Sequence, residues 1–337
     1  MTMLTLAAVA ACGGGHSAKP STTSSASPSV SATSSPKPVV VATCPLTGLP
    51  PQHGQKINRV ALGVKIDNVN DARPQSGLDH ADIVWEETVE GGLTRLLAVF
   101  QCSSASTVGP IRSTRTSDGD LLRLLNGSVF GFSGANPRVL PGVAAASRAV
   151  MISYDALSAY FHRDYSRPAP HNVYSSTTTI LNAGLSRRKG LHAPHPMFAY
   201  GPSAFPGQKI HSVSLTWSSA TAAWTWGGHA WLRTQNGSSD VLADGQRVSA
   251  NNVVIMSITT RASGFHDVLG NSSPDDVVTG KGRVWILRDG HLITGTWNRP
   301  NAASRMVLKG KKGNVIPLHP GRTWIELLPQ PRSPNVS

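Results

Sequence analysis

The segment from Val64 to Arg115 constrains the fold most, because it places many charges among apolar runs. Seven of the chain's eighteen acidic residues lie between Asp67 and Glu90, although the protein has a net charge of +13. Arginines follow at Arg95, Arg112 and Arg115. Burying an unpaired charge is costly, so these carboxylates and guanidiniums predict a polar surface or a buried network of ion pairs.

The apolar runs in this segment predict a sheet. Residues 59–67 alternate and then run apolar, residues 83–87 form a second short strand, and residues 96–100 are continuously apolar. A continuous apolar run is typical of a central strand that is buried on both faces. Gly91 and Gly92 predict a tight hairpin or bulge between the last two strands.

Helices are expected between further strands of this first lobe. Ser117 or Asp118 could cap a helix that carries four leucines, and a strand follows at residues 129–133. Two more helices are predicted over residues 154–161 and 175–188. The first lobe, residues 44–205, is therefore predicted to be mixed α/β.

The second lobe, residues 206–329, has a different pattern of short β segments separated by turns. Asn236-Gly237, Asp244-Gly245 and Asp289-Gly290 are typical hairpin turns. Regular spacing of this kind predicts a mainly antiparallel β domain, sandwich-like or barrel-like, before a tail at 330–337. The expected strands are 213–217, 223–226, 229–233, 253–258, 283–288, 291–297 and 323–328.

The N-terminus resembles a lipoprotein signal. A short apolar run ends in Val9-Ala10-Ala11-Cys12, as in a lipobox whose cysteine is lipidated after cleavage. The usual basic region is missing, which a start codon assigned too far downstream would explain. Residues 1–12 are thus expected to be a truncated signal peptide, and the alternative is an ordinary apolar start. Residues 13–43, rich in Ser, Thr, Ala and Pro, predict a disordered tether.

Composition limits the classes of partner that the protein is expected to bind. No later stretch of about twenty apolar residues predicts a transmembrane helix, so the membrane would be reached through the lipid anchor. The basic balance suits anionic surroundings such as phospholipid heads or cell-wall polyanions, although it could equally serve solubility. Export, and the lack of a Lys/Arg run with interleaved aromatics, argue against nucleic acid as a partner.

Long phrases in the sequence resemble a known family. They are VKIDN, ARPQSGL, ADIVWEE, VEGGLTRLLAVF and VGPIRSTR in the first lobe, with a looser match around residues 277–297. These phrases are similar to those of the YerB-like bacterial lipoproteins, catalogued as a domain of unknown function. The resemblance spans about residues 44–329. It implies a lipid-anchored protein on the outer face of the cytoplasmic membrane, but it names no reaction.

Two cysteines remain besides Cys12. In an exported protein such a pair often forms a disulfide, so Cys44 and Cys102 are expected to be bridged. The alternative is two buried or free thiols. A bridge would join the end of the tether to the end of the predicted strand at 96–100.

Acids and arginines of the first lobe are the candidate ligand-binding residues. Asp67 lies at the carboxyl end of a predicted strand, where α/β sheets often place site residues. Glu86 and Glu87 should point to opposite faces, one to a cleft and one to solvent. Arg112 and Arg115, three apart, could share a helical face if the chain turns helical after Pro110, and could then together hold a phosphate or carboxylate. The candidates are Asp67, Asn68, Arg73, Glu86, Arg95, Arg112, Arg115, His171 and Asn172.

His171 could act as a general acid or base, or it could cap the following helix through its backbone. Other motifs fail as catalytic or cofactor sites. Residues 131–135 resemble a nucleophile elbow without its last glycine, and prolines beside His195 exclude a zincin helix. Gly280-Lys281-Gly282 lacks the spacing of a phosphate loop. No catalytic residue, metal or cofactor is therefore assigned.

Three functions compete. The leading one is a lipid-anchored envelope protein that binds an anionic wall component or an envelope protein through its Arg/Asp/Glu surface. The second is an envelope enzyme acting on a phosphate-containing wall substrate or polyprenyl phosphate, and the third is a non-catalytic scaffold. Convergence of Arg112, Arg115, Asp67 and Glu86 on an open pocket would favour the first two. The oligomeric state stays open.

Overall fold

The computed structural model describes residues 10–15, 42–201, 207–267 and 270–337. Most of the expected signal peptide and tether, and the end of the predicted first lobe, lie outside these residues. Residues 41–337 form one compact unit, which carries all the elements below. None of the helices in the described residues has the length and apolar character needed to span a bilayer.

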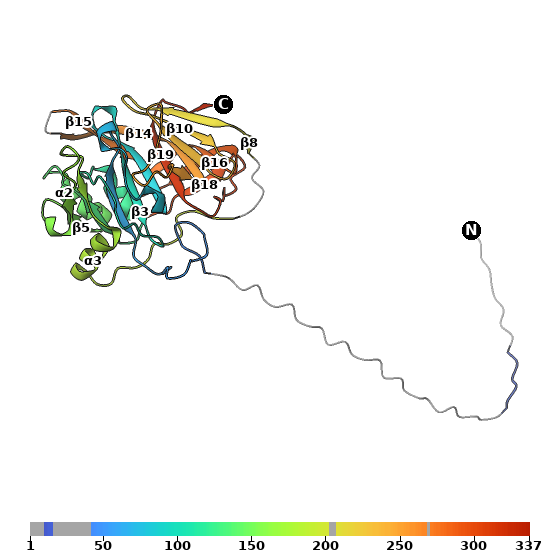
Figure 1. Ribbon diagram of the computed structural model, residues 1–337. Coiled ribbons are helices and arrows are strands. Elements are labelled where there is room, and N and C mark those ends of the chain that lie inside the picture. The colour runs from blue at the N-terminus through green and yellow to red at the C-terminus, as the bar shows by residue number, and fades with distance from the viewer. Residues whose placement is uncertain (1–9, 16–41, 202–206, 268–269) are drawn as a thin grey trace. The chain divides into compact units, whose positions relative to one another are not determined.

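A large mixed sheet dominates the described part of this unit and takes strands from both halves of the sequence (Figure 1). In spatial order the strands of its main path are β18 (Val307–Gly310), β17 (His291–Arg299), β16 (Gly280–Arg288), β14 (Asn252–His266), β19 (Thr323–Pro329), β2 (Ile83–Thr88), β3 (Thr94–Phe100), β1 (Leu62–Asp67), β4 (Val129–Phe132) and β5 (Val150–Ser153). Two more strands, β15 (Ser272–Val277) and β8 (Gln208–Lys209), pair with β14 and β17.

A smaller antiparallel sheet belongs to the second half of the chain. Its strands in the described residues are β12 (Ser238–Ser239), β11 (Trp231–Gln235), β10 (Thr221–Trp226), β9 (Ser212–Thr216) and β20 (Asn335–Val336), with β13 (Ser249–Ala250) paired to β11. A separate ribbon joins β6 (His162–Arg163) to β7 (Val173–Tyr174). The predicted fold class is confirmed, because the first lobe is mixed α/β and the second is mainly antiparallel β.

Helices are few in the described residues and belong to the first lobe. They are α1 (Ser117–Arg123), α2 (Leu140–Ser147) and α3 (Thr177–Arg187), with short 3-10 turns η1 (Asn70–Ala72), η2 (Leu78–His80), η3 (Glu90–Gly92) and η4 (Ser158–Tyr160). Figure 1 shows α2 and α3 grouped near β5, at one edge of the large sheet.

Two helical predictions need correction. Residues 154–161 do not form a helix, because Leu157 and its aromatic neighbours pack against the core from a turn that contains only η4. Ser117 and Asp118 lie inside α1 rather than capping it; the residue before the helix is Thr116, whose side chain makes no capping bond. The helix predicted over 175–188 is confirmed as α3, which begins with a hydrogen bond from the Thr179 amide to Ser176 Oγ.

The core lies on both faces of the large sheet. All six residues of β1 are buried, as are all seven of β3. Val64 and Ile66 join one hydrophobic cluster, whereas Leu97 and Val99 of β3 join the other. Alternate residues of a strand point to opposite faces, so the charged residues of these central strands must be neutralised inside the protein.

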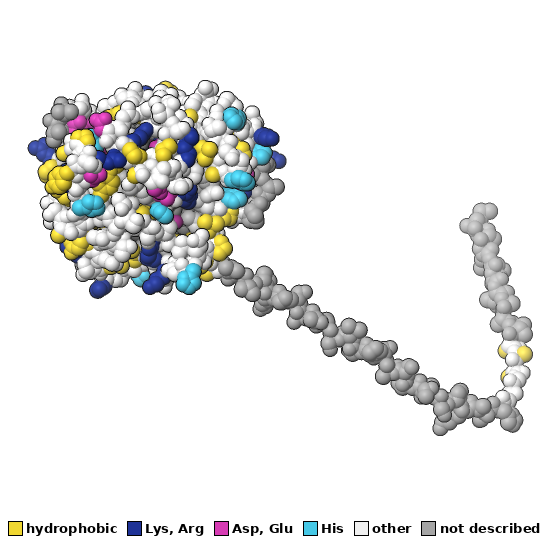
Figure 2. All heavy atoms as spheres, in the orientation of Figure 1, with side chains coloured by type: hydrophobic (Ala, Val, Ile, Leu, Met, Phe, Trp, Pro, Cys, Tyr) yellow, Lys and Arg dark blue, Asp and Glu magenta, His cyan; other side chains and the backbone are white. Residues whose placement is uncertain are grey.

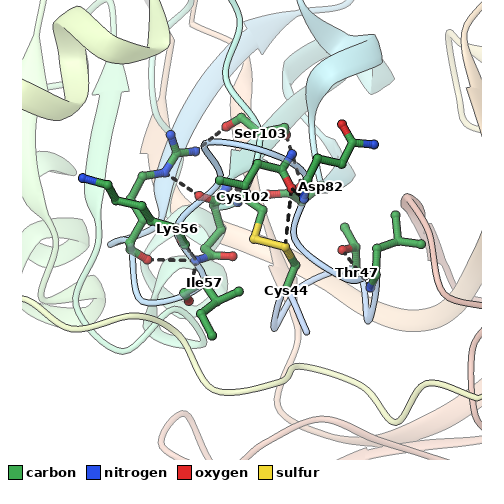
Figure 3. The surroundings of a disulfide bond; sticks show 12 residues. Cys44, Thr47, Lys56, Ile57, Asp82, Cys102 and Ser103 are labelled. Atoms are coloured by element: carbon green, nitrogen blue, oxygen red, sulfur yellow. Dashed lines mark hydrogen bonds between the residues drawn. A yellow bond between two sulfur atoms is a disulfide. The ribbon is translucent and has the colours of Figure 1, made fainter. Parts of the chain in front are cut away.

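The structure contains the predicted disulfide. Cys44 and Cys102 are bonded, and their Cα atoms are 6.0 Å apart. Beside the bond, the Asp82 carboxylate accepts a hydrogen bond from the Cys102 amide at 3.0 Å (Figure 3). Burial raises the pKa of Asp82, although hydrogen bonds from residues 101–103 oppose this rise. The bridge therefore fixes the start of the folded unit to the end of β3.

Candidate functional site

Three neighbouring strands bring the charged residues of the first lobe into one row. In the register of the sheet, Arg95 on β3 lies opposite Asp67 on β1 and opposite Glu87 on β2. Directly opposed residues share one face of a sheet. Glu86 and Glu87 therefore point to opposite faces, as predicted, but both side chains are fully buried and neither faces solvent.

Asp67 contacts two side chains at the end of β1. Its Oδ2 atom lies 2.8 Å from Arg112 Nε and 2.6 Å from His171 Nδ1. Burial alone would raise the pKa of Asp67, but the hydrogen bond with His171 and the charges of Arg112 and Arg95 outweigh it and lower the pKa. Asp67 is therefore an anion that orients two side chains from different loops.

Arg112 approaches this site from a loop rather than a helix, which corrects the prediction of a shared helical face with Arg115. Its amide donates to the carbonyl of Lys65 at 2.9 Å, and its carbonyl accepts from the Ser133 amide at 2.9 Å. The loop is thus held in extended form between β1 and the end of β4. Both Nη atoms of Arg112 lack a hydrogen-bond partner among the described residues, and the side chain is 19% exposed.

Arg115 forms a forked contact with Glu90. Its Nε and Nη2 atoms lie 2.9 Å and 2.6 Å from Glu90 Oε2, and the other carboxylate oxygen accepts a hydrogen bond from Ser273 on β15. Burial would raise the pKa of Glu90, but the bonds from Arg115 and Ser273 lower it. The positive charge of Arg115 is therefore balanced by the carboxylate of Glu90.

Arg95 lies between these two pairs without a carboxylate of its own. The residue is 8% exposed, and its Nη1 atom donates to the carbonyl of Ser113 at 3.2 Å. No carboxylate among the described residues lies within ion-pair distance of it. Burial, together with the charges of Arg115 and Arg112, lowers the pKa of Arg95 to about 9.

We call this set the arginine cluster; its members are Asp67, Glu90, Arg95, Arg112, Arg115 and His171. Three guanidiniums face two carboxylates, so the cluster carries an excess positive charge even before His171 is protonated. Arg112 and Arg115 remain partly exposed, at 19% and 12% of their side-chain surface. Free guanidinium N–H groups around an excess charge are suited to binding a carboxylate or phosphate.

A second network on the same face is sealed from solvent. The Lys65 ammonium contacts Glu87 and, at 3.0 Å, Asp118, and all three side chains are fully buried. Burial and the charge of Asp118 raise the pKa of Glu87 to about 8. This network joins β1, β2 and α1 and serves the fold.

The opposite face carries a third network, which joins the two sheets. Arg233 on β11 contacts Glu86 on β2 and Asp240, and all three side chains are almost fully buried. The Arg233 guanidinium also stacks over Trp324, with its carbon 4.7 Å from the ring centroid. Glu86, a predicted ligand-binding residue, therefore binds Arg233 at the contact with the smaller sheet and does not face a ligand site.

Asn68 and Arg73 belong to this third network as well. Asn68 Nδ2 donates to Glu86 at 3.0 Å and to Thr94 at 2.8 Å, and Arg73 Nη2 donates to the carbonyl of Asn68 at 2.8 Å. Burial lowers the pKa of Arg73 to about 10. These residues hold the turn after β1 in place. The Asn68 amide also donates to Asp67 Oδ1 at 2.9 Å, so this turn borders the arginine cluster.

The histidine and asparagine of the 171–172 pair have separate roles. His171 contacts Asp67, whereas Asn172 accepts a hydrogen bond from Arg163 Nη1 at 2.5 Å beside the β6–β7 ribbon. The capping role considered for His171 is wrong, because Ser176 caps α3. The structure thus unites five of the nine predicted residues in the arginine cluster. Of the other four, Asn68 touches the cluster only through its backbone amide, whereas Arg73, Glu86 and Asn172 lie apart from it. The expected convergence of Glu86 with Arg112, Arg115 and Asp67 therefore does not occur.

Sequence reasoning missed Arg233, Ser273 and Lys65 as partners of these acids. Arg233 carried a usable signal, since it alternates with Trp231 and Gln235 on one buried face of a predicted strand. A charged residue at an inward position requires a buried partner. Ser273 gave no such signal, because it reaches Glu90 only once β14 and β15 have paired, which the local sequence does not reveal.

Comparison with known proteins places the chain among relatives of unknown function. Residues 46–191 match the N-terminal domain of the family described as "Protein of unknown function (DUF3048)", and residues 212–325 match its C-terminal domain. The chain belongs to the DUF3048 family. The resemblance in the first-lobe phrases is thereby confirmed over both lobes.

Two findings connect this DUF3048 chain with one relative. It is 28% identical over 306 residues to "Putative lipoprotein YerB" of Bacillus subtilis (strain 168), covering 87% of this chain and 88% of that protein. The crystal structure of the YerB protein from Bacillus subtilis superimposes with a TM-score of 0.74 at 26% identity, covering 88% of this chain and 99% of that one. The two proteins therefore share their fold over nearly the whole described unit.

Proposed function

We propose that this DUF3048 protein is a lipid-anchored envelope protein, outside the cytoplasmic membrane, that binds an anionic wall component through the arginine cluster. The observation that carries the proposal is the set of N–H donors on Arg112 and Arg95 that no described residue accepts from, around an excess positive charge. The anchor is supported by Cys12, an exposed free cysteine after Val9-Ala10-Ala11, and by the lipoprotein name of the relative.

The chemistry of the cluster defines what it would bind. A phosphate or carboxylate can accept hydrogen bonds from two guanidinium N–H groups at once, which fixes its orientation. Asp67 positions Arg112 by contacting Nε, so both Nη atoms remain for the ligand. His171 lies on the same carboxylate and would add a donor or a charge when protonated. An anionic polymer would meet these groups at the partly exposed edge of the cluster.

The test is titration of the full chain with soluble poly(glycerol phosphate), on a Cys12→Ser background that removes lipidation. Arg112→Gln should weaken binding by about tenfold, since a hydrogen bond to a charged group contributes ~1.5–3 kcal/mol. Arg138→Gln is the matched control, because Arg138 is exposed and lies outside the cluster. Equal binding by the wild type and Arg112→Gln would refute the proposal.

A structural scaffold is the second candidate, favoured by the fully buried network of Arg233, Glu86 and Asp240. In that role the arginine cluster would hold loops and bind nothing. Arg112→Gln would then lower the free energy of unfolding in chemical denaturation. Neither the wild type nor the Arg138→Gln control would bind the polymer. The two candidates therefore differ in which measurement the same variant changes.

A further inference from the structure

A pocket of about 600 Å³ lies where the carboxyl ends of α1, α2 and α3 meet the loop between β17 and β18. This volume is within the range of ~300–1,000 Å³ that is usual for small-molecule sites. The pocket shares no lining residue with the arginine cluster. Figure 2 shows Lys and Arg side chains in small, scattered groups on the face drawn. The lining of this pocket, by contrast, brings five of them together.

The lining is strongly basic. Arg123, Arg148, Arg188, Lys189 and Arg305 contribute to it, and no aspartate or glutamate is among its described lining residues. None of the five cations lies within ion-pair distance of a carboxylate in the described part of the chain. Like charges repel one another, so five cations around one hollow favour an anion between them.

The helix ends explain only part of this charge. A helix C-terminus carries roughly −0.5 elementary charge, so three ends supply roughly −1.5 against five full positive charges. Arg188 does cap a helix, because its Nη2 atom donates to the carbonyl of Arg148 at 2.5 Å. Lys189 lies beyond the end of α3, and Arg305 lies in the β17–β18 loop. These two cations are therefore not accounted for by helix capping.

An apolar groove adjoins the basic pocket. It shares Met197, Met306 and Arg305 with the pocket and continues along Leu308 and Ile316. Val315, another lining residue, is 49% exposed, which is unusual for a large apolar side chain in this protein. Arg305 thus stands at the boundary between a basic hollow and an apolar surface.

We propose that these adjoining sites bind an anionic phospholipid, with its phosphate head group in the basic pocket and part of a hydrocarbon chain in the apolar groove. The charge of the pocket selects the phosphate, and the groove would remove apolar surface of the chain from water. A free phosphate would use the pocket alone. A zwitterionic lipid would use the groove but would place its own cation among the five cations of the protein.

The test uses monomeric short-chain lipids and the full chain with Cys12→Ser, so that neither a membrane surface nor lipidation contributes. Dihexanoyl phosphatidylglycerol should bind at least tenfold more tightly than either glycerol 3-phosphate, which has no chain, or dihexanoyl phosphatidylcholine, which has no net charge. The variant Lys189→Gln/Arg305→Gln should lose at least tenfold in affinity for phosphatidylglycerol. Both side chains are exposed, so thermal melting should be unchanged.

Val315→Ser and Arg138→Gln complete the design. Val315→Ser should weaken phosphatidylglycerol binding and leave the weak binding of glycerol 3-phosphate unchanged, whereas Arg138→Gln should change neither. Equal affinity for glycerol 3-phosphate and phosphatidylglycerol would show a free-phosphate site and overturn the proposal. Equal affinity for the two lipids, or no effect of Lys189→Gln/Arg305→Gln, would overturn it as well. Arg112→Gln should have no effect here, so this test is independent of the arginine cluster.

Discussion

Arg95 and Arg112 keep nitrogen atoms without a hydrogen-bond partner in the described part of the chain, although both side chains are largely buried. The sequence predicted that arginines would meet acids, because charge neutralisation follows from composition and burial. It could not predict which pairs form, since Arg112 reaches Asp67 through the path of a loop. The excess charge of Arg95 likewise depends on strand register. The register places Arg95 opposite Asp67 and Glu87, two acids that already contact other side chains.

Asp276 gives a pH-dependent prediction. Burial raises its pKa from 3.8 to about 6, although bonds from Thr260 and Thr88 oppose the rise. The folded state therefore binds this proton more tightly than the unfolded state, and stability falls as pH rises from about 4 to about 6. A shift of about two units corresponds to about 3 kcal/mol.

Asp276→Asn should remove this dependence, because the amide is neutral at every pH and its oxygen can still accept from the Thr88 amide. Urea denaturation at several pH values is the measurement. The variant should gain stability relative to the wild type between pH 4 and 6, and the difference should stay constant above about pH 7. A difference that shrinks as pH rises would contradict the direction of the shift.

At the scale of elements, apolar periodicity predicted most strands because packing in a sheet follows local alternation. It predicted the buried β3 and the hairpin at Gly91-Gly92, where both glycines have positive φ. It missed α2, whose short segment contains Pro141 and Gly142, and it assigned a helix to residues 154–161, where tertiary packing of aromatic side chains favours a turn.

The disulfide gives the second prediction. Cys44 and Cys102 are 58 residues apart in sequence, so the bridge should stabilise the fold by about 4 kcal/mol in the chain-entropy model. The paired variant Cys44→Ala/Cys102→Ala should lose that amount in chemical denaturation, and Cys12→Ala should lose none. A bridge-free variant as stable as the wild type would show that the segment from Cys44 to β1 is fixed by packing alone.

At the scale of the whole molecule, one sheet joins residues from both halves of the sequence. β2 pairs with β19, so that Ile83 lies opposite Thr323, and Arg233 of the smaller sheet reaches Glu86. Local patterns predict the two lobes, but they contain no information on such long-range pairing. The shared sheet explains why acids of the first lobe find partners such as Arg233 and Ser273 in the second.

The lipid anchor gives the third prediction. In a chain expressed behind a complete lipoprotein signal peptide, Cys12 should be lipidated, and the protein should fractionate with membranes. Metabolic labelling with a fatty-acid probe measures this directly. Cys12→Ala should lose the label and move to the soluble fraction, whereas Cys44→Ala should keep the label. Unchanged labelling of Cys12→Ala would contradict the lipobox interpretation.

Arg95→Gln tests the central claim most directly, because Arg95 supplies the excess charge of the arginine cluster and has no ion-pair partner among the residues that the structure describes. Its binding to poly(glycerol phosphate) and its free energy of unfolding should be measured on the same sample. If the cluster is an anion site, Arg95→Gln should bind at least tenfold more weakly and unfold at equal or higher denaturant concentration. A variant that loses stability while binding as the wild type does would contradict the account.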